Sequence, residues 1–66
     1  MRFFFNLQCE GQSIWDDEGA ESESPASAYS DALTALEEFE EDRAFWEGWD
    51  LEIADAAGCT IAVIHL

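Results

Sequence analysis

The sequence has very little positive charge. None of its 66 residues is lysine and two are arginine, whereas 16 are aspartate or glutamate, giving a formal net charge of -14 at pH 7. Contacts to phosphate groups need lysine and arginine, so Arg2 and Arg43 are too few for an ordinary nucleic-acid-binding protein. An anionic membrane surface would repel the chain for the same reason. We therefore expect no direct contact with nucleic acid or membrane.

Long apolar runs and paired cysteines are also scarce. No segment approaches the ~20 apolar residues of a membrane span. The apolar stretch at residues 1–7 turns polar at Gln8 with no small-residue cleavage site after it, so we expect a strand of a cytoplasmic protein, not a signal peptide. Cys9 and Cys59 stand in unrelated contexts and are expected to be reduced thiols, with a disulfide between neighbouring strands as the alternative.

The residues that carry catalysis or bind metals are sparse as well. His65 is the only histidine, and with two cysteines it cannot supply a convincing tetrahedral zinc site. The acidic run at residues 16–19 lacks the alternating ligand order of an EF-hand loop. The chain has no nucleophile motif and no phosphate-binding glycine loop. We therefore predict a protein that is not an enzyme and has no cofactor and no dedicated metal site.

The chain nevertheless has enough apolar side chains to fold, because 48% of its residues are hydrophobic and 14% are aromatic. Its length allows one domain, residues 1–66, which we expect to be a monomer. Solubility is satisfied by a net charge of roughly 2–8 in magnitude. A larger excess destabilises the compact state by self-repulsion. The excess therefore points to a cationic partner.

Hydrophobic periodicity predicts four strands and one helix. Strands are expected at residues 2–8 and 13–16, before a polar loop at 17–24. Ser24 is a good N-cap with Pro25 at the first helical position, and the helix should run to about residues 43–46. Its apolar face comprises Ala28, Tyr29, Ala32, Leu33, Leu36 and Phe39. Strands at 49–54 and 59–66, around a turn at 55–58, complete a ββαββ order. This pattern favours an α+β fold with a small antiparallel sheet and one amphipathic helix packed on one face.

Three stretches carry a family resemblance: an aromatic strand at residues 2–7, an acidic Asp-Asp-Glu-Gly loop at 16–19, and a hairpin at 49–58 that contains Leu-Glu-Ile. With these motifs the chain resembles a family of short proteobacterial domains of unknown function, which implies a fold and no activity. Members of that family usually mix arginine with acids along the helix, whereas this helix keeps only Arg43. In its size and acidity the chain is similar to phage-borne inhibitors that imitate DNA, including anti-CRISPR proteins.

Imitation of DNA requires carboxylates spaced like phosphates. On the predicted helix, Glu37 with Glu41 and Glu38 with Asp42 form i, i+4 pairs ~6 Å apart along the axis, and Asp31 extends the row. Neighbouring phosphates lie on the order of 6–7 Å apart. Like charges at i, i+4 oppose helix formation, so their repetition favours a function over an ordinary solvated face. A second row is formed by the loop acids Asp16, Asp17, Glu18, Glu21 and Glu23, and Asp50 and Glu52 could extend either row.

The three tryptophans are Trp15, Trp46 and Trp49, and we expect them to pack in the core between the helix and the sheet. Trp46 is placed near the predicted end of the helix. The alternative for this residue is an exposed anchor at a protein interface, where tryptophan is enriched among the residues that dominate binding.

The sequence thus supports a leading hypothesis and two alternatives. The leading one is a non-enzymatic acidic inhibitor that blocks the DNA- or RNA-binding groove of a basic protein, with a subunit of a type I CRISPR surveillance complex (Cascade) as the first target to test. If the chain is phage-encoded, it would act in the host cytoplasm. The alternatives are an antitoxin-like or adaptor domain, and a small bacterial domain whose acidity is incidental.

Overall fold

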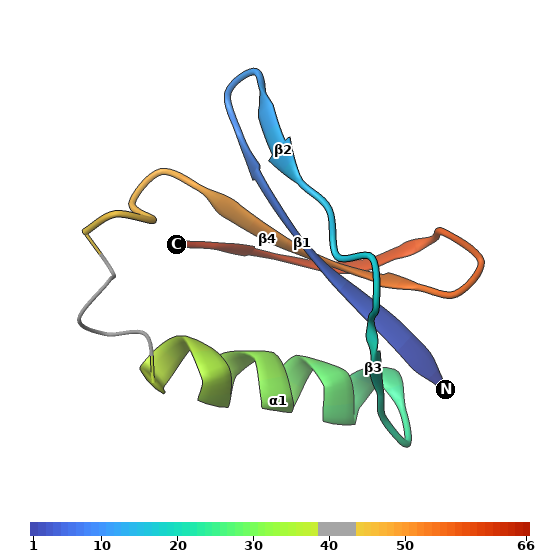
Figure 1. Ribbon diagram of the computed structural model, residues 1–66. Coiled ribbons are helices and arrows are strands. Elements are labelled where there is room, and N and C mark those ends of the chain that lie inside the picture. Colours follow the sequence, from blue (N-terminus) through green and yellow to red (C-terminus); the bar gives the residue numbers. More distant parts are fainter. Residues whose placement is uncertain (39–43) are drawn as a thin grey trace.

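The computed structural model describes residues 1–38 and 44–66. These residues form the strands β1 (Arg2–Cys9), β2 (Gln12–Ile14), β3 (Ala20–Glu21), β4 (Asp50–Asp55) and β5 (Thr60–His65), and the helix α1 (Pro25–Glu38). The pairings are antiparallel throughout: the strand order is β2-β1-β4-β5, and β3 also pairs with β1. One helix lies against one face of the sheet (Figure 1). The predicted α+β fold is confirmed, with β3 added to the ββαββ order.

β2 and β3 pair with the same edge of β1 but leave a gap between them. β2 pairs with the segment from Leu7 to Cys9, and β3 pairs with Arg2 and Phe3. In the gap, the backbone N–H of Phe5 donates to Oδ2 of Asp16 at 3.1 Å. The carboxylate of Asp16 thus takes the place of a missing strand partner, which matters because an unpaired backbone donor in a sheet is costly.

Asp16 also fixes the loop that leads into β3. Its Oδ1 accepts hydrogen bonds from the backbone N–H groups of Glu18 at 3.2 Å and Gly19 at 3.0 Å. The N–H of Gly19 is the main reason that the pKa of Asp16 lies below its ordinary value of 3.8. Partial burial opposes this shift, while the N–H groups of Phe5 and Glu18 and the charge of Arg2 add to it.

The sheet face opposite α1 carries a polar network centred on Asn6, which is 6% exposed. Nδ2 of Asn6 donates to Oε1 of Glu52 at 3.1 Å, and Oδ1 of Asn6 accepts the backbone N–H of Asp16 at 2.9 Å. Glu52 also accepts hydrogen bonds from Gln8 at 3.4 Å and from Thr60 at 2.6 Å. The network therefore joins β1, β4 and β5 to the loop after β2.

The N-terminus of α1 forms as predicted. The Oγ of Ser24 accepts the backbone N–H of Ser27 at 3.1 Å, as an N-cap residue does, and Pro25 is the first helical residue. The described helix ends at Glu38, and Phe39 lies outside the described residues. Residues 44–48 form turns, so the prediction of a helix running as far as Trp46 is wrong at that end.

The core is small and lies between β1, β4 and the N-terminal half of α1. Phe3 and Ile53 are fully buried, and Ala28, Ala32 and Leu51 join them. The partly buried apolar residues packed around this cluster are Phe5, Leu7, Leu36, Ile61, Ala62, Ile64 and Leu66. The predicted apolar face of the helix is thus buried at its two alanines, whereas Tyr29 and Leu33 are 43% and 41% exposed.

The two cysteines are free thiols. Cys9 is the last residue of β1. Cys59 follows the turn after Asp55, and Asp55 pairs with Phe3 near the other end of β1. Six residues of strand separate the two places by about 20 Å, far beyond the reach of a disulfide. The two cysteines are therefore not bonded to each other, and the alternative of a disulfide between neighbouring strands is excluded within one chain. No helix in the described residues has the length and apolar character to cross a membrane.

The close approach at Gly19 gives a test of the loop. Gly19 has a φ of +70°, and a Cβ at this residue would lie 2.8 Å from the carbonyl oxygen of Phe3 and 2.9 Å from the ring of Phe4. Gly11 has a φ of +73° with open space around it and is the matched control. We expect Gly11→Ala to lower the free energy of unfolding by about 1–2 kcal/mol through backbone strain alone. Gly19→Ala should cost about 1–3 kcal/mol more, because of the steric overlap. Equal losses in urea denaturation would contradict this packing.

Asp16 gives a second test, through pH. Because its pKa is lowered in the folded state, its contribution to stability is present above pH 3.8 and is lost as the pH falls through the lower folded pKa. At pH 7, Asp16→Asn should lower the free energy of unfolding by about 1–3 kcal/mol, since one backbone donor loses its charged acceptor. The difference from the unaltered protein should shrink below pH 3.8. Asp17→Asn, at an exposed neighbour, should change little; a constant Asp16→Asn effect from pH 7 to pH 3 would contradict the assignment.

Candidate interaction site

Three of the predicted acidic residues lie exposed on α1: Asp31, Glu37 and Glu38. With 3.6 residues per turn, Asp31 and Glu38 fall on one side of the helix, about 10 Å apart along its axis. Glu37 falls on the opposite flank, one turn after Leu33. The other members of the predicted i, i+4 pairs, Glu41 and Asp42, lie outside the described residues.

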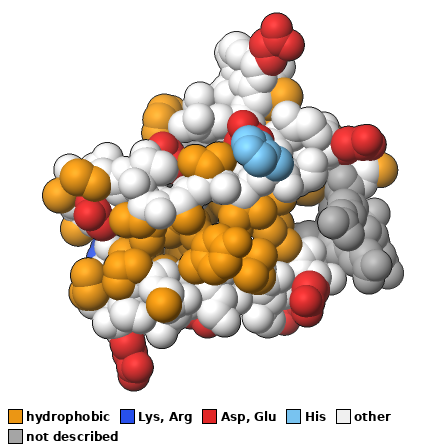
Figure 2. Space-filling view, turned by 180° about the vertical axis from the view of Figure 1, so that it is seen from behind, with side chains coloured by type: hydrophobic (Ala, Val, Ile, Leu, Met, Phe, Trp, Pro, Cys, Tyr) orange, Lys and Arg blue, Asp and Glu red, His pale blue; other side chains and the backbone are white. Residues whose placement is uncertain are grey.

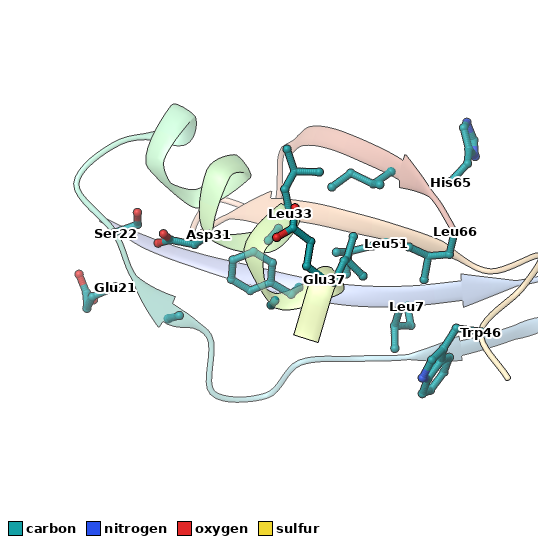
Figure 3. A pocket seen from close by; sticks show the side chains of 16 residues that line it. Leu7, Glu21, Ser22, Asp31, Leu33, Glu37, Trp46, Leu51, His65 and Leu66 are labelled. Atoms are coloured by element: carbon teal, nitrogen blue, oxygen red, sulfur yellow. The ribbon is translucent and has the colours of Figure 1, made fainter. Parts of the chain in front are cut away.

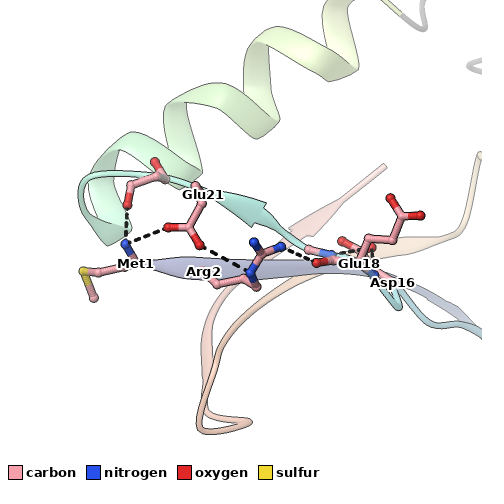
Figure 4. Close-up of polar contacts among 7 residues, drawn as sticks. Met1, Arg2, Asp16, Glu18 and Glu21 are labelled. Carbon is pink, nitrogen blue, oxygen red and sulfur yellow. Dashed lines mark hydrogen bonds and ion pairs between the residues drawn. The ribbon is translucent and has the colours of Figure 1, made fainter.

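The loop acids do not form one row. Asp16 is partly buried and engaged with backbone N–H groups, and Glu21 is held by two cations (Figure 4). The N-terminal amine lies 3.2 Å from Oε2 of Glu21, and Nε of Arg2 lies 3.3 Å from Oε1. Asp17, Glu18 and Glu23 remain exposed. The structure therefore separates the predicted row into two residues that stabilise the fold and three that face solvent.

The acids of β4 also have internal partners. Glu52 belongs to the polar network around Asn6, and Oδ1 of Asp50 lies 2.6 Å from Nδ1 of His65. Within the described residues, ion pairs engage only Glu21 and Asp50 among the acids. The acids of α1 and the loop acids Asp17, Glu18 and Glu23 are thus presented to solvent without a neutralising partner in that part of the chain.

Beside the acidic helix lies an apolar cleft of about 670 Å³, which sequence reasoning missed. It opens between α1 and the helix-facing side of the sheet, and the space-filling view shows hydrophobic side chains gathered there between the two layers (Figure 2). Apolar residues from both layers line it: Phe5, Leu7, Leu51, Ile64 and Leu66 from the sheet side, and Ala32, Leu33, Ala35 and Leu36 from the helix.

The helix sequence explains the cleft. Ala28 and Ala32 let the first half of α1 approach β1 closely, and both are buried. Leucines follow in the second half, where Leu36 is partly buried and Leu33 is 41% exposed. The sequence did contain one signal for the cleft, because the apolar face of the helix has small residues first and leucines later. The amphipathic pattern alone, however, does not distinguish a face that is covered by the sheet from one that is open.

Three acidic side chains also line the cleft. Glu21 and Asp31 lie toward one end, Trp46 and Leu66 lie toward the other, and Leu33 and Leu51 lie between them (Figure 3). Glu37 also lines it, as does His65. Glu21, Asp31 and Glu37 are all exposed, so the apolar surface is flanked by carboxylates.

Trp46 is partly buried and lines the cleft. It therefore packs against its neighbours, as predicted for a core residue, and is also accessible from the cleft, as an interface anchor would be. Its ring meets those of Trp49 and Phe45 edge to face, with centroids 5.4 Å and 4.8 Å apart. Phe45 itself is 72% exposed. The prediction that all three tryptophans pack in the core is wrong for Trp15, which is 62% exposed next to the interrupted edge of β1.

The arrangement offers groups that can bind a partner. It presents an apolar surface, aromatic rings and carboxylates, which suit an interface with a protein. The imidazole of His65 is exposed and faces Asp50. Across residues 1–38 and 44–66, histidine, cysteine and acidic side chains do not gather in threes in a way that could hold a metal ion.

Comparison with known proteins identifies a family and no activity. Residues 2–66 match the model of the family described as Domain of unknown function (DUF6894). No functionally curated protein and no solved structure matches the chain. The predicted resemblance to a family of short domains of unknown function is therefore confirmed, whereas the likeness to anti-CRISPR proteins gains no support from these comparisons. Because the match spans nearly the whole chain, the protein belongs to the DUF6894 family.

Proposed function

We propose that this protein is a non-enzymatic binding domain for a basic protein partner, which it contacts through the exposed acids of α1 and the cleft beside them. The observation that carries the proposal is the exposure of Asp31, Glu37 and Glu38 along one helix without ion-pair partners among the described residues. A net charge of -14 attracts cationic proteins over long range and speeds their encounter with this surface.

Single surface ion pairs contribute only about 0–1 kcal/mol each, so charge alone requires several contacts. The cleft adds an apolar surface next to the acids, and burial of apolar area contributes roughly 25 cal/mol per Å². The combination provides both attraction and affinity, because charged groups mainly guide association while buried apolar anchors slow dissociation.

A narrower form of the proposal is that the domain imitates nucleic acid. In this form it occupies a DNA- or RNA-binding groove, and a subunit of a type I CRISPR surveillance complex is the first target to test. Its support is the small size and extreme acidity of the chain, together with the spacing of the helix acids, since the about 10 Å between Asp31 and Glu38 is on the scale of one to two phosphate repeats.

A second candidate is an adaptor or antitoxin-like domain that binds through shape and aromatic residues. The observation that favours it is the aromatic group of Phe45, Trp46 and Trp49 at one end of the cleft, with Phe45 largely exposed. Such a domain would depend on buried contacts and respond weakly to salt.

Charge reversal tests the main proposal. The protein is first used as bait in a bacterial lysate, and the captured partner is identified by mass spectrometry and purified. Asp31→Lys, Glu37→Lys and Glu38→Lys should each weaken binding of that partner about threefold to tenfold, because an attractive contact becomes repulsive. Raising the salt from about 50 mM to about 300 mM should weaken binding further.

Glu10→Lys is the matched control, since it makes the same change of net charge in the turn between β1 and β2, which lies away from α1 (Figure 1). If Glu10→Lys weakens binding as much as the helix variants do, only net charge matters and the proposed surface is wrong. For the narrower form, the readout is inhibition of DNA binding by a purified type I surveillance complex, and inhibition that survives the combined helix variants would refute it.

The second candidate predicts a different pattern. Trp46→Ala should then reduce affinity at least tenfold, since it removes an aromatic anchor. Added salt should change affinity less than twofold. Calorimetric titration with the captured partner at low and high salt separates the two candidates, because strong salt dependence with a small effect of Trp46→Ala supports the acidic surface instead.

A further inference from the structure

The helix-facing side of β5 is not closed by the fold. Ile64 and Leu66 are only partly buried and line the cleft, and α1 packs chiefly against β1. Leu33 faces the same cleft from the helix and is 41% exposed. An apolar floor and an apolar wall therefore meet without a third element to cover them in the described part of the chain.

The strand order leaves room for one α-helix over β5, beside α1. β5 is separated from β1 by β4 alone, so the two strands lie two strand spacings, or about 10 Å, apart. Packed helices have axes about 8–10 Å apart. A helix laid over β5 would thus lie at normal packing distance from α1, which rests on β1.

The charges flanking the groove select its occupant. Glu37 lines it one turn after Leu33, on the same flank of α1. Asp31 and Glu21 line the end of the cleft near β3. The only lining side chain able to carry positive charge among the described residues is that of His65, which already faces Asp50. A segment with an apolar face and lysine or arginine along its borders is complementary to this surface, whereas an acidic amphipathic segment is repelled.

A second copy of this chain is a poor occupant. Its own amphipathic helix carries Asp31, Glu37 and Glu38, which would meet the same acids of the first copy. Two molecules of charge -14 also repel each other at long range. The groove is therefore matched to a different protein.

We propose that the cleft between α1 and β5 binds a basic amphipathic helix, whose apolar side chains enter between Leu33 and the floor formed by Ile64 and Leu66. This inference deepens the proposed function, on which it rests, by naming the structural class of the partner's binding segment. Binding by such a groove follows helical spacing of the partner's apolar anchors at i, i+3, i+4 and i+7.

Two synthetic peptides of equal composition test it. Each has the 14-residue length of α1 and contains only leucine and lysine in equal number. One places leucine at helical spacing, and the other alternates leucine with lysine, as a strand does. The helical peptide should bind the protein at least tenfold more tightly than the alternating one in fluorescence titrations, although their charge is identical.

Variants locate the bound peptide. Leu33→Ser should weaken binding of the helical peptide about fivefold or more, and circular dichroism should show an unchanged fold because Leu33 is already partly exposed. Val63→Ser is the matched control, since Val63 is 49% exposed on β5 opposite Glu52, on the other face of the sheet, and should leave affinity unchanged.

Several results would overturn the inference. Equal binding of the two peptides would mean that charge alone attracts the peptides. Equal effects of Leu33→Ser and Val63→Ser would mean that the peptide does not bind at Leu33. Either result would refute the groove without contradicting the proposed function. Tighter binding of the alternating peptide would assign strand addition at β5 instead. A dimer of the protein that Leu33→Ser dissociates in sedimentation would assign the groove to a second copy. Absence of any peptide binding would refute the groove, while charge reversal against the captured partner tests the proposed function separately.

Discussion

The fold depends on the pairing of β1 along both of its edges, and one carboxylate makes that pairing continuous. β4 covers one edge of β1, whereas the other edge is shared by two short strands with a gap between them. Asp16 closes the gap by accepting the N–H of Phe5, and the same side chain sets the loop in which Gly19 approaches the backbone of β1. Among the described residues, the large side chains that are fully buried are Phe3 and Ile53. A domain with so small a core has little stability to spare, so an unpaired N–H at Phe5, at a cost of about 1–3 kcal/mol, would be a substantial loss.

The main elements could be predicted from the sequence because their signals are local. Ser24 and Pro25 mark the helix start with side-chain chemistry that needs no tertiary partner, and alternation marks the long strands. β3 escaped prediction because a strand of two residues, Ala20 and Glu21, is too short to show periodicity, and its pairing with β1 depends on the loop that Asp16 organises. The exposure of Trp15 likewise follows from where β2 ends, which composition does not reveal.

Of the candidate site, the sequence predicted the acidic residues but neither their internal partners nor the cleft. The acids of α1 were found by their spacing, and those within the described residues are exposed. Whether an acid has an internal partner depends on contacts between distant segments, as with Glu21 beside Arg2 and Glu52 beside Asn6. The cleft is a property of two layers that meet incompletely, since one helix cannot cover a four-strand width, and no single segment encodes it.

The open edge of β5 has a consequence for the protein in solution. In the described residues β5 pairs with β4 alone, and its sequence, Thr-Ile-Ala-Val-Ile-His, contains no lysine, proline or acid to discourage a strand of another molecule from pairing with it. Mutual repulsion between molecules of charge -14 provides the protection that other edge strands build in locally. We therefore expect the acids of the whole surface to keep molecules apart, and we expect this protection to be lost near the isoelectric point of about 4.1, where β5 edges could pair between molecules.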